Sequence, residues 1–107
     1  IAIANANGGL SLDMAELFRI KGALLLQAQN RSGAEEHFEQ ALAVAEEQSA
    51  LSLQLRAAIS FARLKMQQGD PVEAGRRLAV IYGKFEEGFD TADLKAAKTM
   101  LDEIGAA

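Results

Sequence analysis

Asn30–Glu47, NRSGAEEHFEQALAVAEE, is the stretch that decides the fold of this chain. After a polar break, its apolar side chains fall on one face of a helix, at Ala34, Phe38, Ala41, Leu42 and Ala45. The pattern returns forty residues later, where Ala62, Met66, Ala74, Leu78 and Ile81 stand at the places of Gly22, Leu26, Ala34, Phe38 and Ala41. A repeat of this length predicts stacked helical hairpins.

Composition favours one small domain that folds without metal or disulfide help. The 107 residues include no cysteine, half of them are apolar, and only 6% are aromatic. A chain rich in alanine and leucine predicts helices that pack closely through small side chains. The lack of cysteine fits a reducing cytoplasm, which is the expected localisation.

Charge and hydropathy argue against two classes of partner. The net charge is −4, whereas binding to the phosphate backbone of a nucleic acid depends on clustered Lys and Arg. No apolar run approaches the roughly 18–20 residues that cross a bilayer. We therefore expect neither nucleic acid nor a membrane as a partner.

The N-terminal part of the chain predicts a leader followed by a helix. Residues 1–10, IAIANANGGL, carry no charge and end in Gly-Gly, which is typical of a flexible leader ahead of a helical domain over residues 11–107. The start at Ile rather than Met indicates a fragment of a longer repeat protein. The first helix is expected to begin after Ser11 as N-cap and to end near Ala28. Gly22 in its middle costs about 1 kcal/mol relative to Ala, so a partner helix should approach closely there.

Two further helices follow. Ser32 and Glu35 form a capping-box pattern, so the second helix is expected to start at Ser32 and to end near Gln48. The third helix is expected over about residues 50–68. Between residues 35 and 47 the second contains five acidic residues and no Lys or Arg, and the third contains three Lys or Arg residues and no acidic residue. Opposite charge should help these helices to pair, although exposed ion pairs contribute only about 0–1 kcal/mol each.

The strongest local signal starts the fourth helix. Gly69-Asp70-Pro71 combines a stop, an N-cap and a first helical residue, and the helix is expected to reach about Glu87. A last helix is expected over about residues 91–104, capped by Asp90 or Thr91 and ended by Gly105, with Leu94, Ala97, Leu101 and Ile104 on its buried face.

With both hairpins placed, the pattern resembles the tetratricopeptide repeat (TPR). That family places large, small and aromatic residues at fixed positions of each repeat. In repeat one these positions hold Phe18, Gly22, Leu25, Ala34, Phe38 and Ala41. In repeat two, Ala62, Ala74 and Leu78 fit the same pattern. The resemblance implies an all-α, right-handed TPR-like superhelix with repeat one at about residues 11–48, repeat two at about 50–88 and a C-terminal capping helix at about 91–104. The period exceeds the usual length of about 34 residues, which implies longer helices or a longer link near residues 48–53.

The closing segment carries a second resemblance. Residues 81–104, IYGKFEEGFDTADLKAAKTMLDEI, are similar to the end of the C-terminal repeat region of bacterial class III adenylate cyclases fused to predicted ATPases, and of LuxR-type regulators. This resemblance implies a module of a larger cytoplasmic signalling protein whose cyclase or ATPase chemistry lies in other domains.

The family uses the first helix of each hairpin to line a concave peptide-binding surface. Carried onto this sequence, the surface consists of Glu16, Arg19, Ala23, Leu26 and Gln27 in repeat one, and Arg56, Ile59, Arg63, Met66 and Gln67 in repeat two. Guanidinium groups suit ligands that carry carboxylates, so an extended acidic peptide is the ligand hypothesis. In the alternative interpretation, these arginines face solvent or pair with glutamates of the second helix.

No residue pattern points to catalysis, a cofactor or a metal. His37 is the only histidine, and with nearby Glu36 and Glu39 it offers no convincing ligand set, so we interpret it as a solvated side chain on a helix face. The glycines form no phosphate-binding loop. We expect a non-catalytic protein interaction or regulatory module.

The first helix has more apolar residues than one hairpin can bury. Met14, Leu17 and Leu24 would meet a preceding repeat, and without one they form a self-association face that predicts a homodimer. The last helix is expected to turn Asp93, Lys95, Lys98, Asp102 and Glu103 outward as a polar cap. Two rival functions stay open, namely self-assembly without a groove ligand, and a non-catalytic piece of a cyclase or ATPase.

Overall fold

The computed structural model describes residues 13–106, and within them the backbone forms five α-helices and no strand. The helices are α1 (Met14–Gln27), α2 (Arg31–Glu47), α3 (Leu51–Gln67), α4 (Pro71–Tyr82) and α5 (Ala92–Ala106). The all-α prediction is confirmed, and the superhelical twist stays a prediction. The leader expected at residues 1–10 lies outside the described residues.

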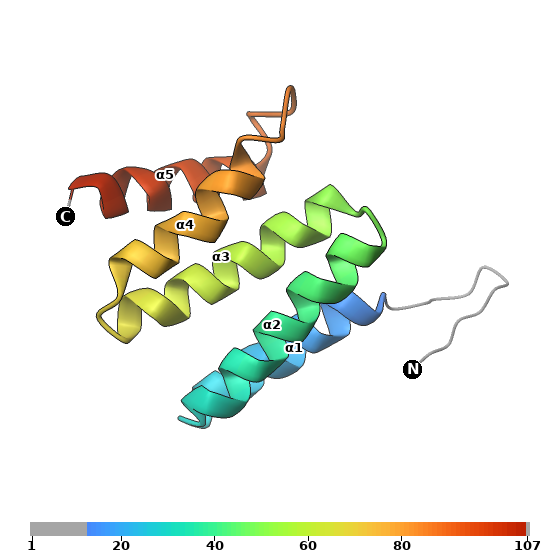
Figure 1. The fold of residues 1–107 in the computed structure, drawn as a ribbon, viewed down its shortest axis with the longest axis vertical. Helices are drawn as coiled ribbons and strands as arrows, with labels where there is room; N and C mark the ends of the chain where they lie inside the picture. Colours follow the sequence, from blue (N-terminus) through green and yellow to red (C-terminus); the bar gives the residue numbers. More distant parts are fainter. Residues whose placement is uncertain (1–12, 107) are drawn as a thin grey trace, which may run out of the picture.

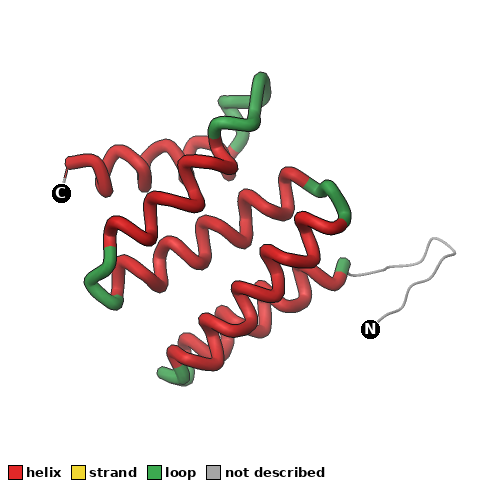
Figure 2. The backbone as a smooth tube through the Cα atoms, in the orientation of Figure 1, coloured by secondary structure: helices red, strands yellow, loops and turns green. Residues whose placement is uncertain are grey.

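The helices form two hairpins and a closing helix (Figures 1 and 2). α1 packs against α2, α3 packs against α4, and α5 lies on α4 and α3. α2 also packs against α3, and this contact joins the two hairpins. In addition, α3 contacts α1 on one side and α5 on the other. No close backbone contact joins α2 to α4 within residues 13–106. One face of the molecule is therefore formed by α1, α3 and α5. On the other face, α2 and α4 stand apart from each other.

The first three links between helices share one geometry. Each has three residues, and its second residue has a positive φ, which is 66° at Gln29, 54° at Ser49 and 78° at Gly69. The amide of the third residue then reaches back to a carbonyl five residues earlier, as in Asn30 N to Leu25 O at 2.8 Å. Because these links are short, the extra residues of the forty-residue period lie in the helices, and α2 and α3 have 17 residues each.

The structure corrects two of the expected helix starts. Asp13 caps α1 by accepting from the backbone N–H of Ala15 at 2.8 Å, whereas Ser11 lies outside the described residues. Asn30 caps α2 by accepting from the N–H of Gly33 at 2.9 Å, so Ser32 is already helical. The capping-box prediction was wrong because the link places Asn30, and not Ser32, at the N-cap position just before the helix.

The start of α4 is confirmed and its end is corrected. Asp70 accepts from the N–H of Glu73 at 3.2 Å, with Pro71 as first helical residue. α4 ends at Tyr82 instead of near Glu87, because the chain turns after Gly83 and brings Phe85 back onto the core. Thr91 begins α5 by accepting from the N–H of Leu94 at 3.3 Å, and the helix runs past Gly105 to Ala106.

The core runs along the contact between the hairpins. Its largest fully buried side chains come from α2, α3 and α4, and they are Phe38, Phe61, Leu55, Leu64 and Leu78. Alanines fill the close approaches between helices, and those at 34, 41, 45, 62, 74 and 97 have no exposed surface. None of the helices in the described part of the chain combines the length and apolar character needed to span a bilayer.

Candidate interaction surfaces

The surface of α1, α3 and α5 contains a shallow concavity of about 250 Å³. It is lined by Arg19, Arg56, Ile59, Ser60, Arg63, Asp93 and Ala96. Four of the residues that the repeat resemblance assigned to the concave face are thus brought together. α5 supplies one wall, which that resemblance did not include.

Two of the three arginines in this concavity are held by carboxylates. Glu16 accepts from Arg19 at 2.6 Å and from Arg56 at 3.2 Å, and Arg56 also donates to Asp93 at 2.9 Å. The hydrogen bond from Arg19 is the main cause that lowers the pKa of Glu16, and the hydrogen bond to Asp93 is the main cause that raises the pKa of Arg56. Arg63 is exposed and has no ion pair within the described residues.

This network corrects the position expected for Asp93. The sequence placed it on the outer, polar side of the last helix, but it faces α3 and joins that helix to α5 through Arg56. The alternative of pairing with glutamates of α2 is wrong for Arg19 and Arg56, whose partners come from α1 and α5. Arg63 faces solvent, as that alternative also allowed.

The other residues assigned to the concave face lie outside this concavity. Leu26 and Met66 are partly buried against the core, and Ala23 is half-buried on α1. Gln27 and Gln67 are exposed at the last positions of α1 and α3. Of the residues assigned to the concave face, only Arg19, Arg56, Ile59 and Arg63 line this concavity.

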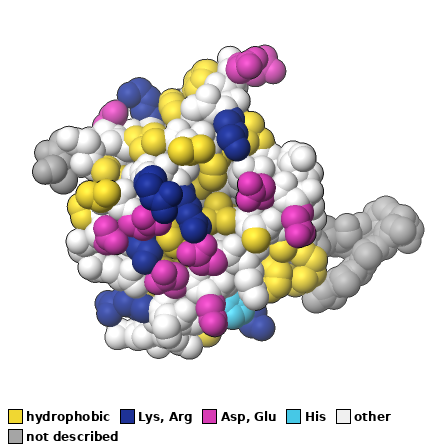
Figure 3. Space-filling model, viewed as in Figure 1, with side chains coloured by type: hydrophobic (Ala, Val, Ile, Leu, Met, Phe, Trp, Pro, Cys, Tyr) yellow, Lys and Arg dark blue, Asp and Glu magenta, His cyan; other side chains and the backbone are white. Residues whose placement is uncertain are grey.

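The opposite face carries the charge pairing expected between α2 and α3. Lys65 of α3 donates to Glu35 of α2 at 2.9 Å, and Arg77 of α4 donates to Glu39 of α2 at 2.7 Å. Both cations also lie over the ring of Phe61, at 5.4 and 4.8 Å from its centroid. Figure 3 shows basic and acidic side chains side by side across the middle of the molecule. The pairing follows the prediction, and Arg77 of α4 also takes part.

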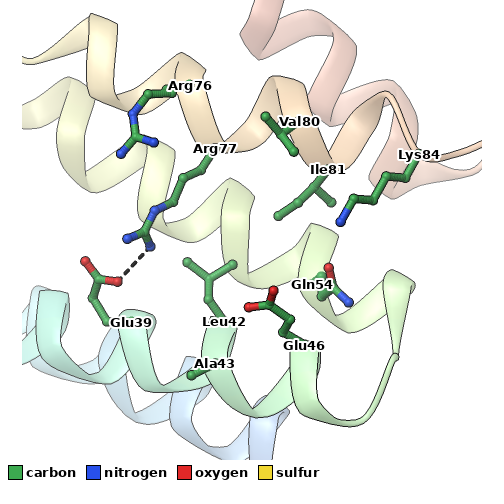
Figure 4. A pocket seen from close by; sticks show the side chains of 10 residues that line it. All are labelled: Glu39, Leu42, Ala43, Glu46, Gln54, Arg76, Arg77, Val80, Ile81 and Lys84. Atoms are coloured by element: carbon green, nitrogen blue, oxygen red, sulfur yellow. Dashed lines mark hydrogen bonds and ion pairs between the residues drawn. The ribbon is translucent and has the colours of Figure 1, made fainter.

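A groove of about 400 Å³ separates α2 from α4, and the sequence did not reveal it. Leu42, Ala43, Val80 and Ile81 give it apolar walls, and the Glu39–Arg77 ion pair crosses it (Figure 4). Gln54 of α3 lies in its floor and is 8% exposed. The groove was missed because its walls come from two hairpins, and helical periodicity does not report how far apart two helices stand.

The outer face of α1 carries the apolar residues expected to self-associate. Met14 is 46% exposed, Leu24 is 60% exposed, and Leu17 is partly exposed. Ile20 lies beside them and is 37% exposed. These residues lie on the side of α1 that has no neighbouring helix among the described residues.

His37 is tied to the protein more firmly than the sequence indicated. Its Nδ1 lies 2.8 Å from the carbonyl oxygen of Gly33, and its ring lies 6.1 Å from that of Phe18. The side chain is partly exposed on the face of α2, in line with its interpretation as a helix-face residue. Within residues 13–106, no cluster of three His, Cys, Asp or Glu side chains could hold a metal ion.

Comparison with protein-family models, curated proteins and solved structures finds no significant match.

Proposed function

We propose that this chain is a non-catalytic helical-repeat module that binds an extended acidic segment of a protein partner on the surface of α1, α3 and α5. We place it within a larger cytoplasmic signalling protein, which is the context that the resemblance of residues 81–104 implies. The observation that carries the proposal is Arg63, an exposed cation without an ion pair among residues 13–106, inside a concavity whose other arginines are already fixed.

The fixed arginines support this assignment. Arg19 and Arg56 lose little conformational freedom when a ligand arrives, because Glu16 and Asp93 already hold them in place. The concavity and its edge contain three guanidinium groups and two carboxylates, so a positive charge is left over at Arg63. A guanidinium can take a ligand carboxylate through two parallel hydrogen bonds, which gives the site a preference for Asp or Glu side chains or a chain terminus.

Fluorescence polarisation with a labelled glutamate-rich peptide and its glutamine counterpart tests the proposal. We expect the glutamate peptide to bind and the glutamine peptide to bind more weakly, with a loss of affinity as salt rises. The Arg63→Gln variant should lose about tenfold in affinity, the size of one hydrogen bond to a charged group.

Arg76→Gln is the matched control, since Arg76 is an exposed arginine on α4 that lines the other groove. If both variants bind like the wild type, or if only Arg76→Gln weakens binding, the site is not on the surface of α1, α3 and α5. Equal affinity for the two peptides would overturn the acidic preference itself.

A further inference from the structure

The internal repeat identifies the outer face of α1 as a face suited to packing against another helix. Met14, Leu17, Lys21 and Leu24 lie forty residues before Gln54, Ala57, Phe61 and Leu64 of α3. These four α3 residues are 8%, 1%, 1% and 0% exposed. α3 packs against the first hairpin, and Gln54 bonds to the Ala45 carbonyl of α2. On α3 this face is therefore a packing face between helices, whereas on α1 it is exposed.

The two ends of the molecule differ in chemistry. α1 presents Met14, Ile20 and Leu24 at one end, with exposed fractions from 37% to 60%. α5 ends the other side with exposed polar residues, among which Lys98 and Asp102 form an ion pair at 3.1 Å. A second copy cannot cover α1 with its α5 face, because apolar side chains gain nothing against paired charges. Three of the six large apolar side chains that are exposed in the described residues lie on α1, so the α1 face of a second copy offers an apolar surface that matches it.

The spacing of the α1 residues suits pairing of this helix with itself. Met14, Leu17, Lys21 and Leu24 stand at i, i+3, i+7 and i+10, which are the a and d positions of two heptads. We propose that two copies of this chain form a symmetric dimer through antiparallel α1 helices, with Met14 of one copy beside Leu24 of the other. This dimer goes beyond the proposed peptide site and does not depend on it.

Lys21 favours the antiparallel arrangement. In a parallel pair the two Lys21 ammonium groups would face each other across the seam, and like charges there are unfavourable. In the antiparallel pair each Lys21 lies opposite Leu17 of the other copy, where its aliphatic stem covers the leucine and its ammonium reaches solvent. The antiparallel arrangement also sets the dipoles of the two helices in opposite directions.

The dimer should be weak and dependent on concentration. α1 has 14 residues and is about 21 Å long, so one helix pair buries less than the roughly 800 Å² per partner of a standard stable interface. Sedimentation velocity from low micromolar to millimolar protein tests the assembly. We expect a monomer at the low end and a dimer at the high end, without larger species, because a twofold interface closes on itself.

Two matched variants locate the interface. Leu24 and Val80 are both 60% exposed and both stand near the end of a helix. Leu24→Lys should stay monomeric at the concentrations where the wild type is a dimer, and Val80→Lys should dimerise as the wild type does. Circular dichroism and thermal melting check that both variants are folded. A monomeric wild type at every concentration, or loss of the dimer in Val80→Lys alone, would overturn the proposal.

Cysteine cross-linking tests the direction of pairing, since the chain has no cysteine of its own. Met14→Cys and Leu24→Cys proteins are mixed and oxidised under mild conditions. We expect the mixed disulfide between the two variants to exceed either homodimeric disulfide. Predominant cross-linking of each variant to itself would overturn the antiparallel pairing. Loss of binding to acidic peptides would leave all these results unchanged, so the two proposals fail separately.

Discussion

Gly22 of α1 lies against the ring of Phe38 of α2, so close that a Cβ atom at Gly22 would stand 2.6 Å from Cε1 of the ring. The same Cβ would lie 3.2 Å from the carbonyl oxygen of Ala34. Phe38 is 1% exposed and is held on all sides. The predicted close approach of a partner helix at Gly22 is thus confirmed, and it explains a glycine in the middle of a helix.

Gly22→Ala should destabilise the protein. Alanine gains about 1 kcal/mol of helix propensity over glycine, but overpacking a filled core costs about 1–3 kcal/mol. Because the contact atoms are a buried ring and a backbone carbonyl, we expect the cost of overpacking to exceed the gain in helix propensity. The free energy of unfolding, measured with urea, should fall by about 1 kcal/mol. Gly105→Ala is the control, since nothing lies within 4 Å of a Cβ there and its stability should rise slightly or stay unchanged. A more stable Gly22→Ala protein would contradict the packing of α1 on α2.

Helix capping gives a second prediction at the start of α2. Asn30→Ala should cost about 1 kcal/mol, because the backbone N–H of Gly33 loses its acceptor. Ser32→Ala should change stability little, since Ser32 is an exposed residue of the first helical turn. Thermal melting of the two variants measures the difference. The reverse order of the two effects would restore Ser32 as the cap that the sequence pattern indicated.

The contrast between Asp70 and Ser32 shows what the sequence could predict about the fold. At Asp70, a glycine before and a proline after left one position for the cap, so local signals were sufficient. At Ser32, two candidate caps stood two residues apart, and the choice depended on the left-handed conformation of Gln29 in the preceding link. Apolar periodicity predicted all five helices, because that signal is local to each helix.

The candidate site was predictable only in part, for a similar reason. The repeat resemblance assigned Arg19, Arg56 and Arg63 to one surface, and all three line the concavity. One partner of Arg56, however, is Asp93, which lies 37 residues away in sequence, on a helix that follows a different kind of link. The residues between Tyr82 and Ala92 break the forty-residue period, so no repeat could place α5 in register.

The left-handed links give a third prediction. Gln29 and Ser49 adopt positive φ angles that cost a non-glycine residue about 1–2 kcal/mol, and Gly69 occupies the equivalent position in the next link. Ser49→Gly should therefore raise the free energy of unfolding by up to about 1 kcal/mol, after the greater entropy of glycine in the unfolded chain is subtracted. Gly69→Ala should lower it, since nothing within 4 Å compensates the strain. Urea unfolding of both variants checks the pair, and destabilisation by Ser49→Gly would contradict the link geometry.

The Glu16 network predicts a dependence of stability on pH. The pKa of Glu16 lies below its ordinary value of 4.5, chiefly through the hydrogen bond from Arg19. A carboxyl with a lower pKa in the folded state contributes stability that is complete above the unfolded value and is lost as pH falls through the folded value. Glu16→Gln should therefore be less stable than the wild type near neutral pH, by about 1 kcal/mol or less, and the gap should close as pH falls below 4.5.

Urea unfolding at a series of pH values measures this gap. Glu47→Gln is the control, because Glu47 is exposed at the end of α2 and has no ion pair within the described residues. It should follow the wild-type pH dependence. A gap that persists in acid would mean that Glu16 stabilises the fold through packing and not through its charge.

The last prediction concerns Gln54 in the floor of the groove between α2 and α4. Its amide is 8% exposed, and its Nε2 donates to the Ala45 carbonyl at 3.4 Å, a long hydrogen bond to an oxygen that already accepts from the Ala50 N–H at 2.9 Å. Its Oε1 has no hydrogen bond to another described residue. A buried polar group left unsatisfied costs about 1–3 kcal/mol.

Gln54→Met should therefore stabilise the protein by about 1 kcal/mol, because methionine keeps the length of the side chain and removes the unsatisfied amide. Methionine also stands at the equivalent position of the first hairpin, as Met14. Gln54→Ala is the control, and it should destabilise the protein by removing contacts between α3 and the groove walls. A Gln54→Met protein that is less stable than the wild type would contradict an unsatisfied amide at this site, because removing such a group should not cost stability.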